Sequence, residues 1–462
     1  MRKYFIAAAM CFLFTFVFFS FLYAQDTTAE NFPFFPSLIN TETGKPVKTG
    51  DFEDPEICSG CHPEIHTQWK GSMHANAFRD PVFQAMWKLG EKETKGFTKN
   101  LCGGCHTGVG VVSNDLVFKD GEFQASDIAK EGVHCDLCHT IKETTFLETP
   151  TYEPQNASFV VAPGSAKKGP YKDSESPHHE CEYSELHTSS KFCANCHQVF
   201  HPVSNFHIER TYDEWKYSVY AQNNIQCQDC HMMPVEKAIE VARTLKKPIN
   251  PGQPCIMGPK RDNMFSHEFV GGNFTVTALL GHNEHAEIAK KRLENAAQLE
   301  IAVPATVKTN AMLPFSITVT NIGAGHNLPT SLTEVRQMWL DITVTDAAGT
   351  VLFQSGKLDD KGNIEQGSRI FNAYALDKNG HHTVKPWEIH RFKYNKTIPP
   401  KGASTESFSC MIPSGTSGPV AVKAVLRYRS YPQSVANLLL GKDAPTLPVV
   451  DMTEATSSVP LN

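Results

Sequence analysis

The chain has 462 residues, of which 40% are hydrophobic and 20% are charged, and this balance excludes a chain that is disordered throughout. Its formal net charge of −6 lacks the basic excess of nucleic-acid-binding proteins, so we expect no nucleic-acid partner. The unusual features are 14 cysteines and 20 histidines, which require a chemical explanation.

The N-terminus has the pattern of a secretory signal peptide. Two basic residues precede an apolar run that ends at Tyr23, and Ala24 comes before a polar stretch. We therefore predict a signal peptide over residues 1–24, with export of the remaining chain. The apolar run approaches membrane-spanning length, so an uncleaved N-terminus that associates the protein with a membrane stays as the alternative.

The next two regions differ in composition. Residues 25–50 are rich in Pro, Thr and Asn and predict an extended lead-in. Residues 51–275 combine many Gly and Pro residues with short helical patches and long polar loops. Because long hydrophobic periodicities are few, the polypeptide alone is not expected to form a standard core here, and something else should fill the interior.

Five segments of residues 51–275 share the spacing Cys-x-x-Cys-His. Their cysteines are Cys58, Cys61, Cys102, Cys105, Cys135, Cys138, Cys193, Cys196, Cys227 and Cys230, and their histidines are His62, His106, His139, His197 and His231. This spacing is the attachment signature of haem c. Two thiols three positions apart reach the vinyl groups on one edge of the porphyrin, and the adjacent histidine ligates the iron. The sequence therefore predicts five haem c groups that form the interior of this region.

Two other uses of paired cysteines explain the pattern less completely than haem does. Structural zinc sites combine two Cys-x-x-Cys units, but five units cannot pair off completely, and zinc does not explain the histidine after every second cysteine. Export also permits a disulfide framework, which leaves the histidines unexplained too. Haem c accounts for both the cysteines and the histidines.

The sequence after residue 275 predicts one helix followed by antiparallel strands. Ala286–Leu299 is amphipathic and rich in helix formers, so we assign a connecting helix to residues 276–300. Clusters of β-formers separated by turn signals predict a β-sandwich over residues 301–435, followed by an irregular tail over 436–462. The β-former clusters are Leu313–Val319, Met338–Val344, Val351–Phe353 and Val420–Tyr428. The predicted fold is α+β and multidomain, with a haem-packed, mostly helix-and-loop N-terminal domain and an antiparallel β-sandwich.

The iron ligands on the far side of each haem should come from histidines outside the motifs. Removing the five motif histidines from the total of 20 leaves fifteen, so supply exceeds demand. The candidates are His74, His178, His267 and His326. His74 lies in a turn-like stretch beside Met73, a competing soft ligand, and the glycines and proline around His326 would let its loop approach a flat ring. Less favoured are His66, His134, His187 and His207.

Five stretches carry a family likeness: Cys58–His74 with a W-x-x-S-x-H pattern, Glu131–Asp136, Glu209–Met232, Ser266–Gly272 and Gly323–Thr330. They resemble the bacterial multihaem c-type cytochromes with a cytochrome c-554-like haem domain. The resemblance covers most of residues 51–435. It implies electron transfer in the periplasm or at the cell surface, mostly through haems with two histidine ligands, and it implies that His74 and His267 are such ligands.

These features favour an exported electron carrier over an enzyme, and no residue is assigned a catalytic role. We expect electrons to pass along five haems of a respiratory chain, between redox protein partners in the periplasm or on the surface of a bacterium. Two alternatives stay open. One is a haem enzyme with a five-coordinate iron that acts on a small nitrogen or sulfur compound. The other is a homo-oligomer, the protomer of an extracellular filament, in which a histidine is donated between copies.

Overall fold

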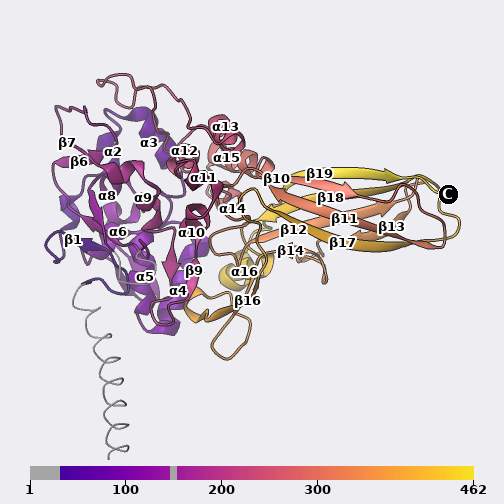
Figure 1. Cartoon of the computed structure of the whole chain (residues 1–462). Coiled ribbons are helices and arrows are strands. Elements are labelled where there is room, and N and C mark those ends of the chain that lie inside the picture. Colours follow the sequence, from indigo (N-terminus) through magenta and orange to yellow (C-terminus); the bar gives the residue numbers. More distant parts are fainter. Residues whose placement is uncertain (1–31, 146–152) are drawn as a thin grey trace, which may run out of the picture.

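The protein is described by a computed structural model over residues 32–145 and 153–462. The predicted signal peptide, residues 1–24, lies outside these described residues. Figure 1 shows helices and loops gathered at one end, with long strands extending away from them. Within residues 32–145 and 153–462, no helix combines the length and the apolar character that crossing a membrane requires.

The part before residue 275 is built from short helices and short strands. Its helices are α2 (Pro55–Cys58), α3 (Pro63–Lys70), α4 (Pro81–Thr94), α5 (Phe97–His106), α6 (Gly108–Val112), α7 (Asp127–Lys130), α8 (Cys135–His139), α9 (Ser190–Ala194), α10 (Thr211–Lys216), α11 (Val219–Gln222), α12 (Gln228–His231) and α13 (Val235–Thr244), followed by α14 (Phe274–Leu279). Its strands are β1 (Asn40–Thr41), β2 (Val117–Lys119), β3 (Glu122–Gln124), β4 (Ile141–Thr144), β5 (Phe159–Val161), β6 (Ala166–Gly169), β7 (Glu180–Tyr183), β8 (Val199–Phe200) and β9 (His207–Glu209).

Local sequence signals explain where several of these helices start. Helices α2, α3 and α4 each begin with a proline, whose fixed φ suits the first helical position and whose missing N–H costs nothing there. The Asp80 carboxylate then accepts hydrogen bonds from the N–H groups of Val82 and Phe83, at 2.8 and 3.1 Å, and so caps α4.

The described part of the predicted extended lead-in, residues 32–50, forms little regular secondary structure but packs against the rest of the protein. Phe34, Leu38 and Ile39 are buried, and β1 pairs in parallel with β5. The Leu38 N–H also donates to the carbonyl of Asn156, at 2.8 Å. The segment folds inward because burial removes three large apolar side chains from water.

The interior of the helical part has two components. One is an apolar cluster around α4, α5 and α6, whose fully buried members include Trp87, Val109 and Leu116. The expectation that the polypeptide forms no core of its own is therefore wrong in part. The other component is a large cavity, described below as the candidate site.

The C-terminal part contains two main antiparallel sheets. Its strands are β10 (Ala297–Ala302), β11 (Ala311–Asn321), β12 (Gln337–Thr345), β13 (Val351–Ser355), β14 (Ile370–Phe371), β15 (Ala373–Leu376), β16 (Arg391–Asn395), β17 (Ala403–Ile412), β18 (Val420–Arg429) and β19 (Val450–Val459). One sheet has the order β10-β11-β17, and the other has β13-β12-β18-β19, with β14 also paired to β12. All four predicted β-former clusters lie within strands, namely β11, β12, β13 and β18.

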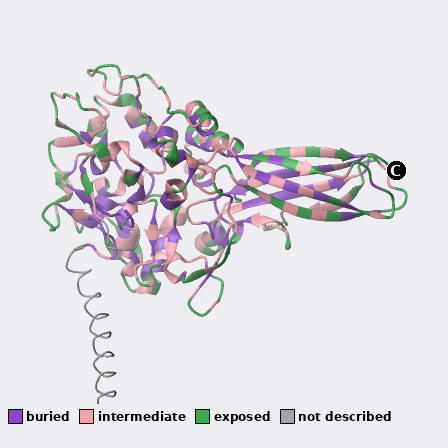
Figure 2. Ribbon diagram, viewed as in Figure 1, coloured by how far each residue is buried: buried purple, intermediate pink, exposed green. Residues whose placement is uncertain are grey.

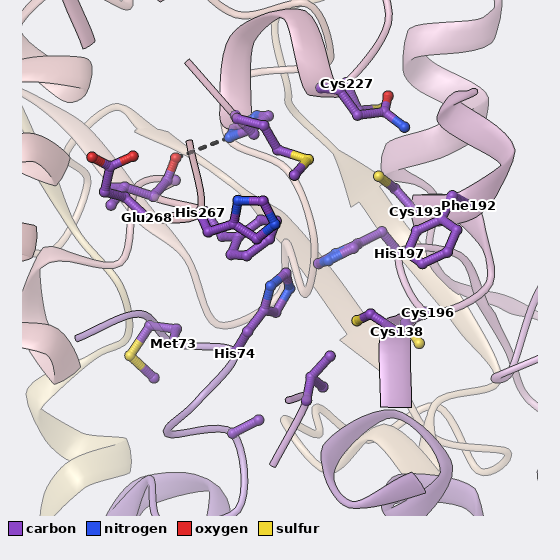
Figure 3. A pocket seen from close by; sticks show the side chains of 18 of the residues that line it. Met73, His74, Cys138, Phe192, Cys193, Cys196, His197, Cys227, His267 and Glu268 are labelled. Atoms are coloured by element: carbon purple, nitrogen blue, oxygen red, sulfur yellow. Dashed lines mark hydrogen bonds between the residues drawn. The ribbon is translucent and has the colours of Figure 1, made fainter. Parts of the chain in front are cut away.

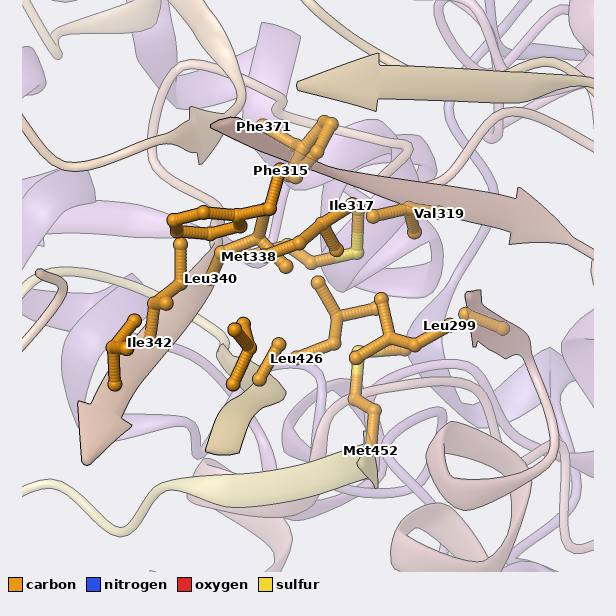
Figure 4. Close-up of a cluster of buried hydrophobic side chains, with 14 of the residues drawn as sticks. Leu299, Phe315, Ile317, Val319, Met338, Leu340, Ile342, Phe371, Leu426 and Met452 are labelled. Atoms are coloured by element: carbon orange, nitrogen blue, oxygen red, sulfur yellow. The ribbon is translucent and has the colours of Figure 1, made fainter. Parts of the chain in front are cut away.

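Both sheets contribute to one hydrophobic cluster. Burial alternates along most of β11, β17 and β19, as expected when one face of a strand is covered, and Figure 2 shows this alternation in the long strands that it draws with changing colours. Phe315 and Ile317 of the first sheet belong to the same buried cluster as Leu340 and Met452 of the second, and Figure 4 shows these side chains gathered together. Each such side chain contributes roughly 1.5–3 kcal/mol by leaving water. This arrangement is compatible with the predicted β-sandwich.

The predicted connecting helix over residues 276–300 is broken and ends early. Helix α14 is followed by α15 (Asn283–Glu294), and β10 begins at Ala297. Ala297 and Leu299 are buried while Gln298 and Glu300 are exposed, which is the alternation of a strand. Pairing with β11 over six residues outweighs the helix propensity of this short stretch.

The prediction of an irregular tail over residues 436–462 is wrong. Helix α16 (Gln433–Leu440) runs into this segment, and β19 then pairs with β18 along its length. Val450, Met452 and Val459 are buried on one face of β19, with serines and threonines between them. Strand β19 forms because the edge of β18 provides backbone hydrogen-bond partners. The apolar side chains of β19 are also buried against the hydrophobic cluster.

Candidate haem-binding site

All five Cys-x-x-Cys-His motifs line one internal cavity of about 1090 Å³. The ten motif cysteines are neither fully buried nor fully exposed. A helical turn organises the motifs: the N–H of His62 donates to the Cys58 carbonyl at 2.9 Å, and His231 donates to Cys227 at 2.8 Å. Such a turn places residues i, i+3 and i+4 on one face, so two thiols and one imidazole approach the cavity together.

Four of the five motif imidazoles are oriented by a backbone carbonyl. The Nδ1 partners are the carbonyl of Pro254 for His62 at 2.7 Å, of Ala77 for His106 at 2.9 Å, of Lys168 for His139 at 2.6 Å and of Val270 for His231 at 2.9 Å. A carbonyl that accepts from Nδ1–H fixes the tautomer and leaves the Nε2 lone pair free for a metal. The site therefore presents four imidazoles in the form that ligates iron.

Three motif imidazoles face a second imidazole at the spacing that one iron would require. The ring centroids are 6.2 Å apart for His197 and His74, 6.4 Å for His139 and His267, and 6.2 Å for His231 and His326. Two imidazoles on opposite sides of one metal, each with a metal–nitrogen bond of about 2 Å, place their centroids about 6 Å apart. Figure 3 shows His74, His197 and His267 converging on the same part of the cavity.

The partner imidazoles are themselves held in place by neighbouring elements. The backbone N–H of His267 donates to the Gln68 side-chain oxygen at 2.9 Å, and the Nδ1 of the His267 ring lies 3.0 Å from the Phe265 carbonyl. The Nδ1 of His326 lies 2.9 Å from the Asn327 carbonyl. His74 packs against the Phe269 ring, with centroids 4.5 Å apart.

The loop that carries His326 is tied to the helical part through Glu214 of α10. The Glu214 carboxylate accepts from the N–H of Asn327 at 3.2 Å and from the Thr330 hydroxyl at 2.5 Å. Burial raises the pKa of Glu214 to about 7. The strand-rich part thus delivers His326 into the cavity through a loop that α10 anchors.

Burial keeps most of these imidazoles neutral, which is the form that binds a metal. Loss of solvent lowers the pKa of His74, His231 and His267 to about 3, and that of His106 to about 4. His197 is the exception, because the neighbouring Glu209 carboxylate outweighs the effect of burial and raises its pKa.

Two further histidines line the cavity but make other contacts. His178 is exposed, lines the cavity and donates its N–H to the Ser176 hydroxyl at 3.1 Å. His187, which the sequence favoured less, has its ring centroid 5.7 Å from that of His139, and its Nε2 lies 3.1 Å from the Cys138 carbonyl. No ring contact of the described residues pairs His62 or His106 with a second histidine. The individual ligand assignments therefore stay predictions.

Thiols of different motifs meet inside the cavity. The contacting pairs are Cys58 with Cys135, Cys105 with Cys196, and Cys193 with Cys227. Each contact raises the pKa of one thiol of the pair. Cys138 of the third motif also raises the pKa of both cysteines of the fourth motif, Cys193 and Cys196. The fourth motif therefore adjoins the second, third and fifth, whereas the first adjoins the third.

Within residues 32–145 and 153–462, no group of three or more His, Cys, Asp or Glu side chains is arranged to hold a metal ion on its own. The donor set of each motif, two thiols and one imidazole beside a large apolar-walled cavity, fits a covalently attached haem.

Comparison with known proteins supports this chemistry. The profile of a family described as "Cytochrome c554 and c-prime" matches residues 57–140, a span that contains the first three motifs. No curated protein sequence matches the chain.

Solved structures give the fold. A penta-heme cytochrome c552 from Thermochromatium tepidum is similar, with a TM-score of 0.61 and 17% identity over 88% of this chain and 99% of that chain. A CARDB domain of the PF1109 protein from Pyrococcus furiosus covers 36% of this chain and 87% of its own, with 12% identity and a TM-score of 0.18, which is too low to support an argument. The first similarity extends across both the helical and the strand-rich parts.

Proposed function

We propose that the chain is a multihaem c-type cytochrome that carries electrons along five covalently bound haem c groups, as the matching family profile and the similar fold support. One observation carries the proposal: five motifs meet in one cavity, and three of their imidazoles face a second imidazole about 6 Å away. The count of five rests on the motifs of this sequence. The similar penta-heme cytochrome c552 supports the same number.

The residues of the chain hold and orient the haems. A haem iron with two imidazole ligands supplies one-electron chemistry and has no open position for a substrate. The cysteines would hold each porphyrin edge, and the backbone carbonyls at Nδ1 hold the motif imidazoles in one orientation. His74, His267 and His326 would complete the iron coordination of the fourth, third and fifth haems. The chain itself transfers no proton in this mechanism.

The contacts between motifs define the proposed order of the haems. The first motif adjoins the third through Cys58 and Cys135, and the third adjoins the fourth through Cys138. The fourth motif then adjoins the second and the fifth, and the haems that these motifs would hold would follow the same order. The proposed path is therefore branched, with the fourth haem as its node.

The location and the partners belong to the same proposal. The signal-peptide pattern of residues 1–24 supports export to the periplasm or the cell surface of a bacterium. In that location the protein would serve a respiratory chain and exchange electrons with redox protein partners through exposed haem edges. The electron donor and acceptor are to be found by experiment.

Stepwise reduction of the purified full-length protein tests this function. An electron carrier takes up five electrons per chain and shows no turnover with nitrite, hydroxylamine or sulfite. Catalytic turnover with one of these compounds, together with a high-spin signal that changes when it is added, would replace the carrier with the haem enzyme. Uptake of fewer than five electrons would contradict the haem count.

A further inference from the structure

The fourth motif differs from the other four in what its imidazole Nδ1 faces. In the other motifs a neutral backbone carbonyl lies 2.6–2.9 Å from Nδ1. The Nδ1 of His197 instead faces the carboxylate of Glu209, with 3.5 Å between Nδ1 and Oε1. This separation exceeds a normal N–H···O bond of about 2.7–3.2 Å, so the pair is a charge contact that a small side-chain rotation would close.

The fold brings Glu209 to this position through a short hairpin. Strand β8 begins two residues after His197, and its first residue, Val199, pairs with Glu209 of β9. Because His197 lies just before β8, this pairing places the Glu209 carboxylate next to the His197 imidazole. This register makes the contact a property of the backbone and not of a flexible surface side chain.

The Glu209 carboxylate is buried and lacks a fixed cationic partner. Glu209 is 8% exposed, and within the described residues the only other polar contact of its carboxylate is the Thr211 hydroxyl at 3.4 Å. The adjacent Arg210 pairs with Asp213 instead, at 3.5 Å. A buried carboxylate without a cation is costly, so a positive charge in the cavity would be stabilised beside it.

We propose that Glu209 lowers the reduction potential of the haem held by His197 relative to the other four haems. This inference rests on the proposed function. A carboxylate at Nδ1–H makes the imidazole a stronger donor, and its negative charge favours the ferric iron, which carries one more positive charge than the ferrous iron. Reduction of this haem takes one electron from a neighbouring haem, breaks no bond and leaves the Nδ1 proton between His197 and Glu209.

The position of this haem gives the lowered potential a consequence for electron flow. The fourth motif adjoins the second, third and fifth through its cysteines. A low potential at the branch point means that electrons cross this haem without accumulating on it. Electrons would then reside on the other haems, and the fourth haem would control their exchange between the branches.

The test is a potentiometric titration of Glu209→Gln in the full-length haem-loaded protein. We expect the variant to keep five low-spin haems and to change the redox equilibrium constant of one haem at least tenfold. For a one-electron reaction this change moves the midpoint potential of that haem by at least 59 mV to a more positive value. His74→Ala, which turns the fourth haem high-spin, identifies which potential belongs to it. The matched control is Glu153→Gln, because Glu153 is equally buried at 7% exposure but pairs with Lys216.

The outcomes separate this inference from the proposed function. If Glu209→Gln loses haem, Glu209→Asp keeps the charge and predicts a smaller positive shift of the same potential. Five haems that titrate with unchanged potentials in both variants would overturn the role of Glu209 and leave the electron carrier intact. An equal shift of all five potentials would also overturn it. A wild-type protein without five titrating haems would overturn the function itself.

Discussion

His326 shows how a single residue can join the two parts of the molecule. It lies in a loop between β11 and β12, yet its ring faces that of His231 with centroids 6.2 Å apart. We predict that His326→Ala turns one haem high-spin, because the iron loses a strong-field ligand. Electron paramagnetic resonance of the oxidised protein measures this change. His390→Ala, at an exposed position of the strand-rich part, should leave all haems as they are. An unchanged spectrum for His326→Ala would remove this histidine from the ligand set.

Glu334 gives a prediction about pH. It is 4% exposed, neither of its carboxylate oxygens has a hydrogen-bond partner in the described structure, and burial raises its pKa to about 7. The unfolded chain loses this proton near pH 4.5, so the folded form binds more protons between about pH 4.5 and 7. Stability contributed by this group therefore falls as the pH rises through that window and stays low above it.

The variant Glu334→Gln removes this titration. At pH 8 it should raise the free energy of unfolding by up to roughly 3 kcal/mol, since one pKa unit corresponds to 1.36 kcal/mol. At pH 4 the carboxyl is protonated in both states, and the variant and the wild type should be equally stable. Chemical denaturation at the two pH values measures the difference. The same stability difference at pH 4 and pH 8 would show that Glu334 is not a buried acid.

At the scale of elements, the packing of residues 32–41 on α5 depends on a glycine of the second motif. A Cβ added to Gly104 would collide with the Ser37 hydroxyl and would lie 2.9 Å from the Ala157 Cβ. Gly60 occupies the same position in the first motif, where a Cβ would meet only the Ile57 carbonyl, at 3.4 Å.

We therefore predict that Gly104→Ala lowers the free energy of unfolding by about 1–3 kcal/mol through overpacking, which exceeds the gain in helix propensity of about 1 kcal/mol. Gly60→Ala is the matched control and should change stability by less than about 0.5 kcal/mol. Thermal unfolding of the haem-loaded variants compares the two. Equal effects at both glycines would show that the N-terminal segment does not pack on α5.

The elements that the sequence predicted well are those with a strong local pattern. Strands β11, β12 and β18 are rich in β-formers, which alternate with polar residues in β11 and cluster in β12 and β18, and their positions agree with the prediction. Strands β10 and β19 were missed for two different physical reasons. The first continues a run of helix formers after α15, and the second is mostly serine, threonine and acidic residues on its exposed face. Both depend on a neighbouring strand that a local pattern does not contain.

The candidate site was predicted to a similar extent. Spacing alone predicted the ten cysteines and five histidines. Of the four histidines predicted as second ligands, the structure places His74, His267 and His326 opposite motif imidazoles, whereas no ring contact of the described residues pairs His178 with one. The contacts between thiols, the pairing of particular histidines and the carboxylate beside His197 arise from residues far apart in the chain. Such contacts require the tertiary fold.

The whole molecule has two parts with separate roles. The helical part gathers five motifs around one cavity, and the strand-rich part has its own apolar cluster and reaches the cavity through the His326 loop. Glu93 of α4 ties the parts together elsewhere, because it accepts from Lys385 at 2.7 Å and from the Trp387 ring at 3.1 Å. The strand-rich part thus completes the site that the helical part builds.

The central claim is that five haems are covalently attached to this polypeptide, and the mass of the intact protein tests it most directly. We predict that the mass under denaturing conditions exceeds that of the polypeptide by five haem groups, and that replacing Cys193 and Cys196 by Ala leaves four. A mass equal to that of the bare polypeptide, or an excess of any other number of haems, would contradict it.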